Sequence, residues 1–222
     1  GAAKRFFPAS GKVPDLVTIA APQYNTWIEL TYNQNQADVM AYAKAIVENG
    51  LPPGLMAIDD TWQTDYGVWE FDAAKFSDPK GMCDELHKMG FKVELWLAPF
   101  VSADSRPYRY LRDTLKEGLI WEKRPNTAAM VEWWNGTSAE LDLTDPAGVM
   151  WLTDTLRGLQ TKYGVDGFKF DAADLGFYRP EMRSYKEGAV PADHCEAYAR
   201  LGLEFPLNEY RACWKMAGQP LV

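Results

Sequence analysis

The chain has 222 residues, enough for one sizeable hydrophobic core and too few for two large domains. Hydrophobic residues make up 47% and charged residues 24%, an ordinary globular composition that excludes a disordered chain. The net charge of -8 would repel a nucleic-acid backbone, so we expect no nucleic-acid partner. No run of about 18 apolar residues is present, so we expect no membrane-spanning segment.

Strand-like and helix-like segments alternate along the chain. Short apolar runs predict strands at 17–21, 55–58, 91–98 and 165–170, and a further extended piece at 210–214. Apolar residues at helical spacing predict helices that begin near residues 33–38, 79 and 146, and another over about 193–203. Asp78 before Pro79 and Asp145 before Pro146 are typical helix starts.

This alternation predicts a parallel sheet of the α/β class, either doubly wound or a (β/α)8 TIM barrel. No GxGxxG or GxxxxGK[ST] turn follows the first predicted strand, which argues against a nucleotide-binding layer. The second and fourth predicted strands end in carboxylates, and barrel enzymes gather their chemistry at the carboxyl ends of strands. We therefore expect an incomplete barrel of about four to five βα units.

One connection, about residues 101–138, is too long for a plain loop and holds Trp121, Trp133 and Trp134. Residues 119–122 and 130–133 could pair as a hairpin. We expect this insertion to form a small subdomain over the carboxyl ends of the strands.

Cysteine and histidine give no support for a metal site. Cys83, Cys195 and Cys213 cannot all pair and show no CxxC spacing, and His87 and His194 stand far apart. The nine tryptophans are typical both of sugar-binding clefts and of large buried cores.

The segment 164–171 is the most informative. Strand alternation puts Lys169 and Asp171 on the inward face and turns Phe168 and Phe170 toward the helices. A buried lysine needs a partner, and Asp171 is the natural one within the strand. A neighbouring lysine also keeps a carboxylate ionised, as a nucleophile requires. The alternative is a structural ion pair, or Asp171 as the cap of the next turn.

Two other strand ends carry candidate binding residues. Only one of the adjacent Asp59 and Asp60 can point at a ligand, where it could accept two sugar hydroxyls; the alternative is a turn aspartate. Glu94 and Trp96 share a face of the third predicted strand. We expect Glu94 to pair with Lys92, and Trp96 to be either a pocket wall or part of the core.

Several of these runs together resemble glycoside hydrolase family 31, and the resemblance covers nearly the whole chain. The matching motifs are Ile58–Gln63, Tyr66-Gly67, Phe91–Trp96, Trp133–Gly136, Leu141–Pro146 and Phe168–Asp171. Within the family, the chain is most similar to the branch with a Lys-Phe-Asp nucleophile strand, which includes α-galactosidase-like members. The α-glucosidases usually carry tryptophan at the position of Lys169.

The resemblance implies roles for individual residues. Asp171 falls on the catalytic nucleophile, and Asp59 on the carboxylate that binds hydroxyls of the sugar in the cleaved subsite. Trp134 falls on the tryptophan that lines that subsite, Trp96 lies near the wall formed by the third strand, and Lys169 occupies a subsite position that differs between branches. A weaker match places Arg211 on an arginine near the fifth strand.

The implied reaction is hydrolysis of a terminal α-glycosidic bond, α-glucoside or α-galactoside, with retention through a covalent glycosyl-enzyme on Asp171. The implied substrate is an oligosaccharide or another α-glycoside, and no metal or organic cofactor is needed. The family's acid/base is an aspartate on a later strand, and the chain ends at Val222 before a candidate for it. We therefore expect residues 1–222 to be part of a catalytic barrel domain.

Two further expectations follow from reading the chain as a fragment. It begins at Gly1 with no charged-then-apolar leader, which indicates either a processed start or a piece of a longer protein. Expressed alone, it should be neither well folded nor active, and an apolar interior edge should be exposed.

Two other classes of protein remain as alternatives. The first is a non-catalytic carbohydrate-binding protein on a hydrolase-like barrel, which would not need an intact nucleophile. The second is a metal-dependent hydrolase or an enolising lyase, which would need the clustered ligands that this chain lacks.

Overall fold

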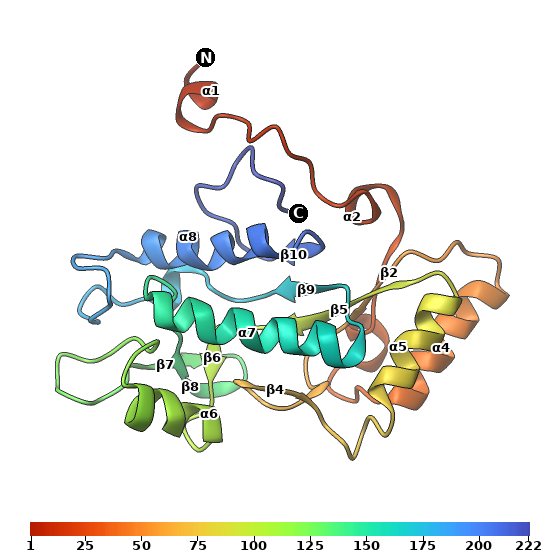
Figure 1. Cartoon of the computed structure of the whole chain (residues 1–222), viewed down its shortest axis with the longest axis horizontal. Helices are drawn as coiled ribbons and strands as arrows, with labels where there is room; N and C mark the ends of the chain where they lie inside the picture. The colour runs from red at the N-terminus through yellow and green to blue at the C-terminus, as the bar shows by residue number, and fades with distance from the viewer.

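The computed structural model describes residues 1–222 and is built on a five-stranded parallel sheet (Figure 1). Its strands, in spatial order, are β1 (Gln23–Asn25), β2 (Leu55–Ile58), β5 (Lys92–Leu97), β9 (Gly167–Phe170) and β10 (Asn208–Tyr210). Spatial order follows chain order, as it does in a (β/α)8 barrel, and the sheet curls into about half of one. The predicted incomplete barrel is therefore confirmed.

Helices cover the outside of the sheet (Figure 1). The covering helices are α4 (Gln36–Glu48), α5 (Pro79–Lys88), α7 (Pro146–Tyr163) and α8 (Pro191–Leu201), each of which buries one face. The shorter helices are α1 (Ala2–Phe6), which stands away from the sheet, α2 (Leu16–Ala20), α3 (Trp27–Leu30) and α6 (Arg106–Arg109). A π-helical turn, Tyr110–Leu115, follows α6, and short 3₁₀ turns lie at Leu175–Phe177 and Gly202–Glu204. None of the helices is both long and apolar enough to cross a membrane.

Two small antiparallel sheets complete the fold. The first is a hairpin after β2, and the second has the strand order β6-β8-β7 and follows β5. Their strands are β3 (Gln63–Asp65), β4 (Val68–Phe71), β6 (Phe100–Val101), β7 (Met130–Trp133) and β8 (Gly136–Glu140). Because β6 begins three residues after β5 ends, the second sheet starts at the carboxyl end of the parallel strands.

The long helices begin at the caps that the sequence predicts. The side chain of Asp78 accepts a hydrogen bond from the backbone N–H of Gly81 (2.9 Å), and that of Asp145 accepts one from Ala147 (2.9 Å). Gly164 ends α7 with a φ of +78°, a left-handed conformation that favours glycine. Local chemistry therefore sets the bounds of α5 and α7.

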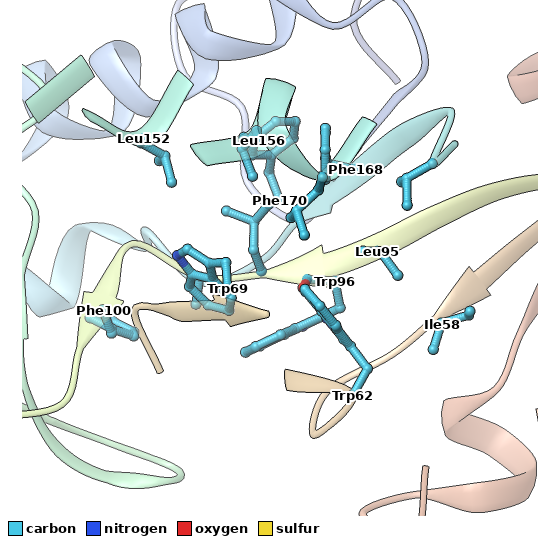
Figure 2. Packing of buried hydrophobic residues seen from close by; sticks show 14 of the residues in the cluster. Ile58, Trp62, Trp69, Leu95, Trp96, Phe100, Leu152, Leu156, Phe168 and Phe170 are labelled. Atoms are coloured by element: carbon cyan, nitrogen blue, oxygen red, sulfur yellow. The ribbon is translucent and has the colours of Figure 1, made fainter. Parts of the chain in front are cut away.

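The core lies between the parallel sheet and its helices (Figure 2). Phe168 and Phe170 of β9 are fully buried on the helix side, as alternation predicts, and Phe170 packs edge-on against Tyr198 of α8 at 5.6 Å. Trp62 and Trp69, from the hairpin that follows β2, extend this core. Outward burial of both phenylalanines leaves Lys169 on the inward face.

The predicted first strand at 17–21 is wrong. Leu16–Ala20 forms α2, and the first strand of the sheet is β1, which begins at Gln23. The side chain of Asp15 accepts a hydrogen bond from the backbone N–H of Val17 (3.0 Å) and so caps a helical turn. Periodicity alone cannot tell a strand from a helical turn over so few apolar residues.

The predicted hairpin between 119–122 and 130–133 is also wrong. Strand β7 pairs instead with β8, and Trp133 lies opposite Gly136 across a two-residue turn. The shorter connection carries the smaller loop-closure cost, and Gly136, the residue directly after the turn, has a φ of +110°, a conformation that favours glycine.

The expected exposed apolar edge is not observed either. The apolar inward residues Leu55, Ala57 and Leu207 are buried, and the backbone N–H of Tyr210 donates to the carbonyl of Val222 (2.7 Å), so the outer edge of β10 is partly paired. Much of the inward face is polar rather than apolar, which directs attention to its ionisable residues.

Candidate active site

Side chains from two parallel strands form an ion pair at the carboxyl end of the sheet. Nζ of Lys169, on β9, lies 2.7 Å from Oδ2 of Asp59, the residue that follows β2. The two side chains are 18% and 5% exposed. Burial opposes the charge of Lys169, but Asp59, assisted by Glu209 and Asp171, outweighs it and raises the pKa of the lysine. Lys169 is therefore charged at neutral pH.

Lys169 pairs with Asp59 and not, as expected, with Asp171. Strand β5 lies between β2 and β9, and the lysine side chain crosses it to reach Asp59. A sequence spacing of two places Asp171 about 6–7 Å further along the strand. The long, flexible lysine stem therefore pairs with a residue that is 110 positions away in the chain.

Asp59 is held by further donors. Nδ2 of Asn25, at the end of β1, donates to Oδ2 of Asp59 (2.8 Å), and the backbone N–H of Asp60 donates to Oδ1 (2.9 Å). With Lys169, three of about four lone-pair sites of the carboxylate are occupied. Asn25 is not among the predicted site residues because the first strand is predicted at 17–21. With β1 at Gln23–Asn25, its position at the carboxyl end of a barrel strand marks it as a candidate.

Asp171 follows β9 and is held by contacts to both of its oxygens. The indole Nε1 of Trp96 donates to Oδ2 (2.8 Å), and the backbone N–H of Ala172 donates to Oδ1 (2.8 Å). Nε of Arg211 lies 3.7 Å from Oδ1. Trp96 is buried, so its observed role is to orient this carboxylate rather than to form an open wall.

The backbone beyond Asp171 is strained. Ala172 and Ala173 have φ angles of +61° and +59°, in the left-handed region that alanine rarely adopts. Both residues are fully buried, so the surrounding packing holds them there. Strain of this kind clusters at functional sites, where it fixes the direction of a side chain.

Trp134 occupies the turn between β7 and β8 and is 46% exposed. The guanidinium of Arg211 lies 5.2 Å from the centre of its ring, and the ring of Phe177 lies 6.0 Å away. Arg211 therefore contacts Trp134 and also lies near Asp171. In the sequence Arg211 is only a weak match, and no motif there points to Phe177.

Asp60 faces away from Lys169, as expected for the neighbour of Asp59. Its Oδ2 accepts hydrogen bonds from the hydroxyl of Tyr66 (3.2 Å) and from Nδ2 of Asn135 (2.6 Å). Burial raises the pKa of Asp60. Because Asn135 follows Trp134, Asp60 ties the turn that carries the exposed indole to the end of β2.

The predicted pairing of Glu94 with Lys92 is wrong. Nζ of Lys92 lies 2.8 Å from Asp166 instead, because the lysine is at the exposed beginning of β5. Glu94 is fully buried and neither of its oxygens has a hydrogen-bond partner. Burial, and then the charge of Glu209, raise its pKa well above the usual range.

A separate hollow of about 490 Å³ lies between the segment 116–121 and the segment 180–189. Trp121, Asp142, Arg183 and Tyr185 are among the residues that line it. None of the predicted site residues lies there, so the strand ends around Asp171 remain the candidate active site.

Comparison with known proteins places the chain among glycosidases. Residues 17–208 match the glycosyl hydrolases family 31 TIM-barrel domain. The chain is 29% identical over 202 residues to a myogenesis-regulating glycosidase of Mus musculus, covering 91% of this chain and 28% of that protein. It is 28% identical over 203 residues to an alpha-xylosidase of Emericella nidulans, covering 89% and 25% respectively. The chain thus spans about a quarter of the length of these relatives.

Solved structures share the fold. A GH31 dextranase from Flavobacterium johnsoniae, complexed with glucose, superimposes with a TM-score of 0.80 at 17% identity, over 95% of this chain and 27% of that one. A GH31 alpha-xylosidase from a soil metagenome, complexed with xylose, gives a TM-score of 0.74 at 21% identity, over 89% and 30%. At these identities the likeness concerns the fold alone.

Proposed function

This chain belongs to glycosyl hydrolase family 31, and from that premise we propose that it supplies the nucleophile and part of the sugar subsite of a retaining α-glycosidase. The observation that carries the proposal is the position of Asp171. Its carboxylate stands at the carboxyl end of a barrel strand, oriented by Trp96 and the backbone of Ala172, within the same site as the Lys169–Asp59 pair.

In the proposed reaction, an oxygen of Asp171 attacks the anomeric carbon, and the bond from that carbon to the leaving oxygen breaks. A second carboxylic acid, about 5–5.5 Å away, donates its proton to the leaving oxygen and then takes a proton from the water that cleaves the glycosyl-enzyme. We propose that this acid/base comes from a part of the protein beyond Val222. No step requires a metal or an organic cofactor.

The sugar would be held by groups that retain unused bonding capacity. Lys169 has ammonium protons beyond the one directed at Asp59, and Asp59 has about one free lone-pair site. The exposed face of Trp134 could pack against the apolar face of a pyranose ring. These contacts support an oligosaccharide or other α-glycoside as the substrate.

The first experiment replaces the nucleophile in the full-length protein that carries these residues. Asp171→Asn keeps the shape of the side chain, so we expect kcat to fall by about 10³–10⁵-fold while the fold survives. A mechanism-based fluorosugar should label Asp171 in the wild type. Asp154→Asn, on the exposed side of α7, is the matched control and should retain activity.

Two outcomes would contradict this assignment. Near-normal turnover by the Asp171→Asn variant, or labelling at another residue, would place the nucleophile elsewhere. Saturable binding of a sugar by a wild-type protein that hydrolyses no α-glycoside would favour the alternative of a non-catalytic carbohydrate-binding protein.

The finer proposal concerns the Lys-Phe-Asp branch. An ammonium at Lys169 can donate to hydroxyls where an indole face cannot, so we expect α-galactosides or unusual α-glucosides to be cleaved faster than maltose. Comparison of kcat/KM on nitrophenyl α-galactoside, nitrophenyl α-glucoside and maltose tests this. A clear preference for maltose would contradict it.

We further propose that residues 1–222 form part of one catalytic barrel domain, with an insertion at about 101–138. Expressed alone, the chain should not hydrolyse α-glycosides, because the acid/base of the proposed mechanism is not among its residues, a contribution of about 10²–10⁴-fold in rate. Cleavage of an α-glycoside by these residues alone would show that the acid/base lies within them.

A further inference from the structure

The end of β1 is fixed to the end of β2 by contacts that leave Asn25 little freedom. In the register of the sheet, Asn25 lies opposite Ala57, two residues before Asp59. The backbone N–H of Thr26 donates to the carbonyl of Ala57 (3.0 Å), and the backbone N–H of Asp59 donates to the hydroxyl of Thr26 (3.0 Å). Thr26 is fully buried. Asn25 therefore stands on a rigid part of the barrel, directly beside the carboxylate of Asp59.

The side-chain amide of Asn25 has a single favourable orientation. Its Oδ1 accepts a hydrogen bond from the backbone N–H of Trp27 (2.7 Å), and its Nδ2 donates to Oδ2 of Asp59 (2.8 Å). A rotated amide would turn its oxygen toward the carboxylate and its nitrogen toward the N–H, so both contacts would be repulsive. Asp59 uses one of the two amide protons, and the second has no acceptor within the chain. Because Asn25 is only half-buried, a ligand can reach that second proton.

The contacts of Asp59 leave one of its oxygens open to a ligand. Oδ2 accepts from Nδ2 of Asn25 (2.8 Å) and from Nζ of Lys169 (2.7 Å), which fills its two lone-pair positions. Oδ1 accepts only from the backbone N–H of Asp60 (2.9 Å) and keeps one position. The site thus presents one acceptor beside two donors that each keep a spare proton. A hydroxyl group, which both donates and accepts, satisfies this arrangement.

We propose that Asn25 is a specificity-determining residue of the sugar subsite: its second amide proton binds the sugar hydroxyl that donates to Oδ1 of Asp59. The inference deepens the proposed function and rests on it, because the ligand is the sugar of that subsite. The selected substrates are α-glycosides whose terminal sugar carries a hydroxyl at this point. A sugar that lacks the hydroxyl leaves both Oδ1 and the amide proton without a partner, which disfavours its binding.

The first test pairs one change in the protein with one change in the sugar. The full-length protein is titrated by calorimetry with galactose, glucose and the monodeoxy analogues of whichever sugar binds more tightly. In the wild type, removal of the hydroxyl read by Asp59 should raise Kd by about 10–100-fold. In Asn25→Ala, the same removal should cost about tenfold less, because the donor is already gone. An equal cost in the two proteins at every hydroxyl would overturn the proposal.

Asn25→Asp separates the contact with the sugar from the contact with Asp59. The new carboxyl group keeps the bond from the N–H of Trp27 and lies against Asp59, so the two acids share a proton at low pH and repel each other when both ionise. Relative to the wild type, Kd should be weakest at high pH and recover as the pH falls. The recovery should stop about tenfold short of the wild type, because the single shared proton holds Asp59 and leaves none for the sugar.

The wild type measured at the same pH is the reference for this comparison. Lys169 on β9, Asp60 after β2 and Glu94 on β5 are the other ionisable groups that act on Asp59, and they are common to both proteins. A ratio of the two Kd values that does not change with pH would show that Asn25 does not hold Asp59. Full recovery at low pH would show that the second amide proton does not bind the sugar.

Asn35→Asp is the matched control. At the start of α4, Oδ1 of Asn35 accepts from the backbone N–H of Asp38 (3.0 Å), and Nδ2 donates to the carboxylate of Asp38 (2.7 Å). This amide therefore makes the same two kinds of contact as that of Asn25, but its carboxylate partner is exposed and lies outside the proposed subsite. Asn35→Asp should keep the Kd of the wild type at every pH.

The design separates this inference from the proposed function. A protein that binds the sugar and cleaves α-glycosides, but in which Asn25→Ala changes no hydroxyl preference, would refute the role of Asn25 alone. The predicted preference in a protein that cleaves no α-glycoside would refute the glycosidase and leave the role of Asn25 standing. A protein that binds none of these sugars would refute the subsite and with it both proposals. If Asn25→Ala fails to fold, Asn25→Asp at low pH still decides.

Discussion

Replacement of Lys169 by methionine should destabilise the barrel, because it leaves Asp59 as a buried carboxylate without its cation. The two groups lie 2.7 Å apart, and Asp59 is only 5% exposed, so water can replace little of the lost interaction. Breaking a buried pair by removing one partner costs about 3–5 kcal/mol. Asp59 retains two hydrogen bonds, from Asn25 and from the backbone of Asp60, so we expect the lower end, about 3 kcal/mol.

A second variant separates the lost ion pair from lost packing. Lys169→Met combined with Asp59→Asn removes both charges, so the double variant should be more stable than Lys169→Met alone by about 1–2 kcal/mol. The surface control is Lys162→Met. Lys162 lies 3.0 Å from Glu70, but the two side chains are 57% and 50% exposed, and such pairs contribute less than about 1 kcal/mol.

The assay is thermal unfolding of the full-length variants, followed at the transition of the barrel. A loss of 3 kcal/mol corresponds to a fall of about 6–12 °C in Tm for a domain of this size. A Tm of Lys169→Met no lower than that of Lys162→Met, or a double variant no more stable than the single one, would show that Lys169 does not stabilise the fold through Asp59.

Three other changes test separate parts of the fold. In the unfolded chain Glu94 loses its proton above about pH 4.3, whereas in the folded protein its raised pKa keeps the proton bound. The free energy of unfolding should therefore fall by up to about 1.4 kcal/mol per pH unit until the pH reaches the raised folded pKa. Urea unfolding at a series of pH values measures this slope, and Glu94→Gln should remove it. In α7, the Cβ added by Gly158→Ala would have no atom within 4 Å, so this variant should be more stable by about 0.5–1 kcal/mol. The Cβ added by Gly148→Ala would lie 2.4 Å from the carbonyl oxygen of Asp142, so that variant should have a lower Tm. A lower Tm for Gly158→Ala than for Gly148→Ala would contradict the packing. Asp78→Ala removes the cap of α5 and should cost about 1 kcal/mol in the same urea assay, and an unchanged midpoint would show that the cap is dispensable.

Local chemistry made much of this fold predictable. The strand Leu55–Ile58 and the helices α5 and α7 depend on neighbouring residues: an apolar run, a capping aspartate, a proline at the first turn and a terminal glycine. The inward direction of Lys169 follows from strand alternation, because Phe168 and Phe170 are buried on the other side. Motif resemblance supplied the family, which the match over residues 17–208 confirms.

The contacts between segments that are distant in the chain depend on the tertiary structure. Lys169 pairs with Asp59 rather than Asp171, and Glu94 lies beside Glu209 rather than Lys92, because strand order and register bring these side chains together. The apolar run at 17–21 became a helical turn because no neighbouring strand takes up its backbone groups, and a nearby aspartate caps it. Sequence patterns report local preference and burial, whereas the partner of a buried charge is selected by the geometry of the whole sheet.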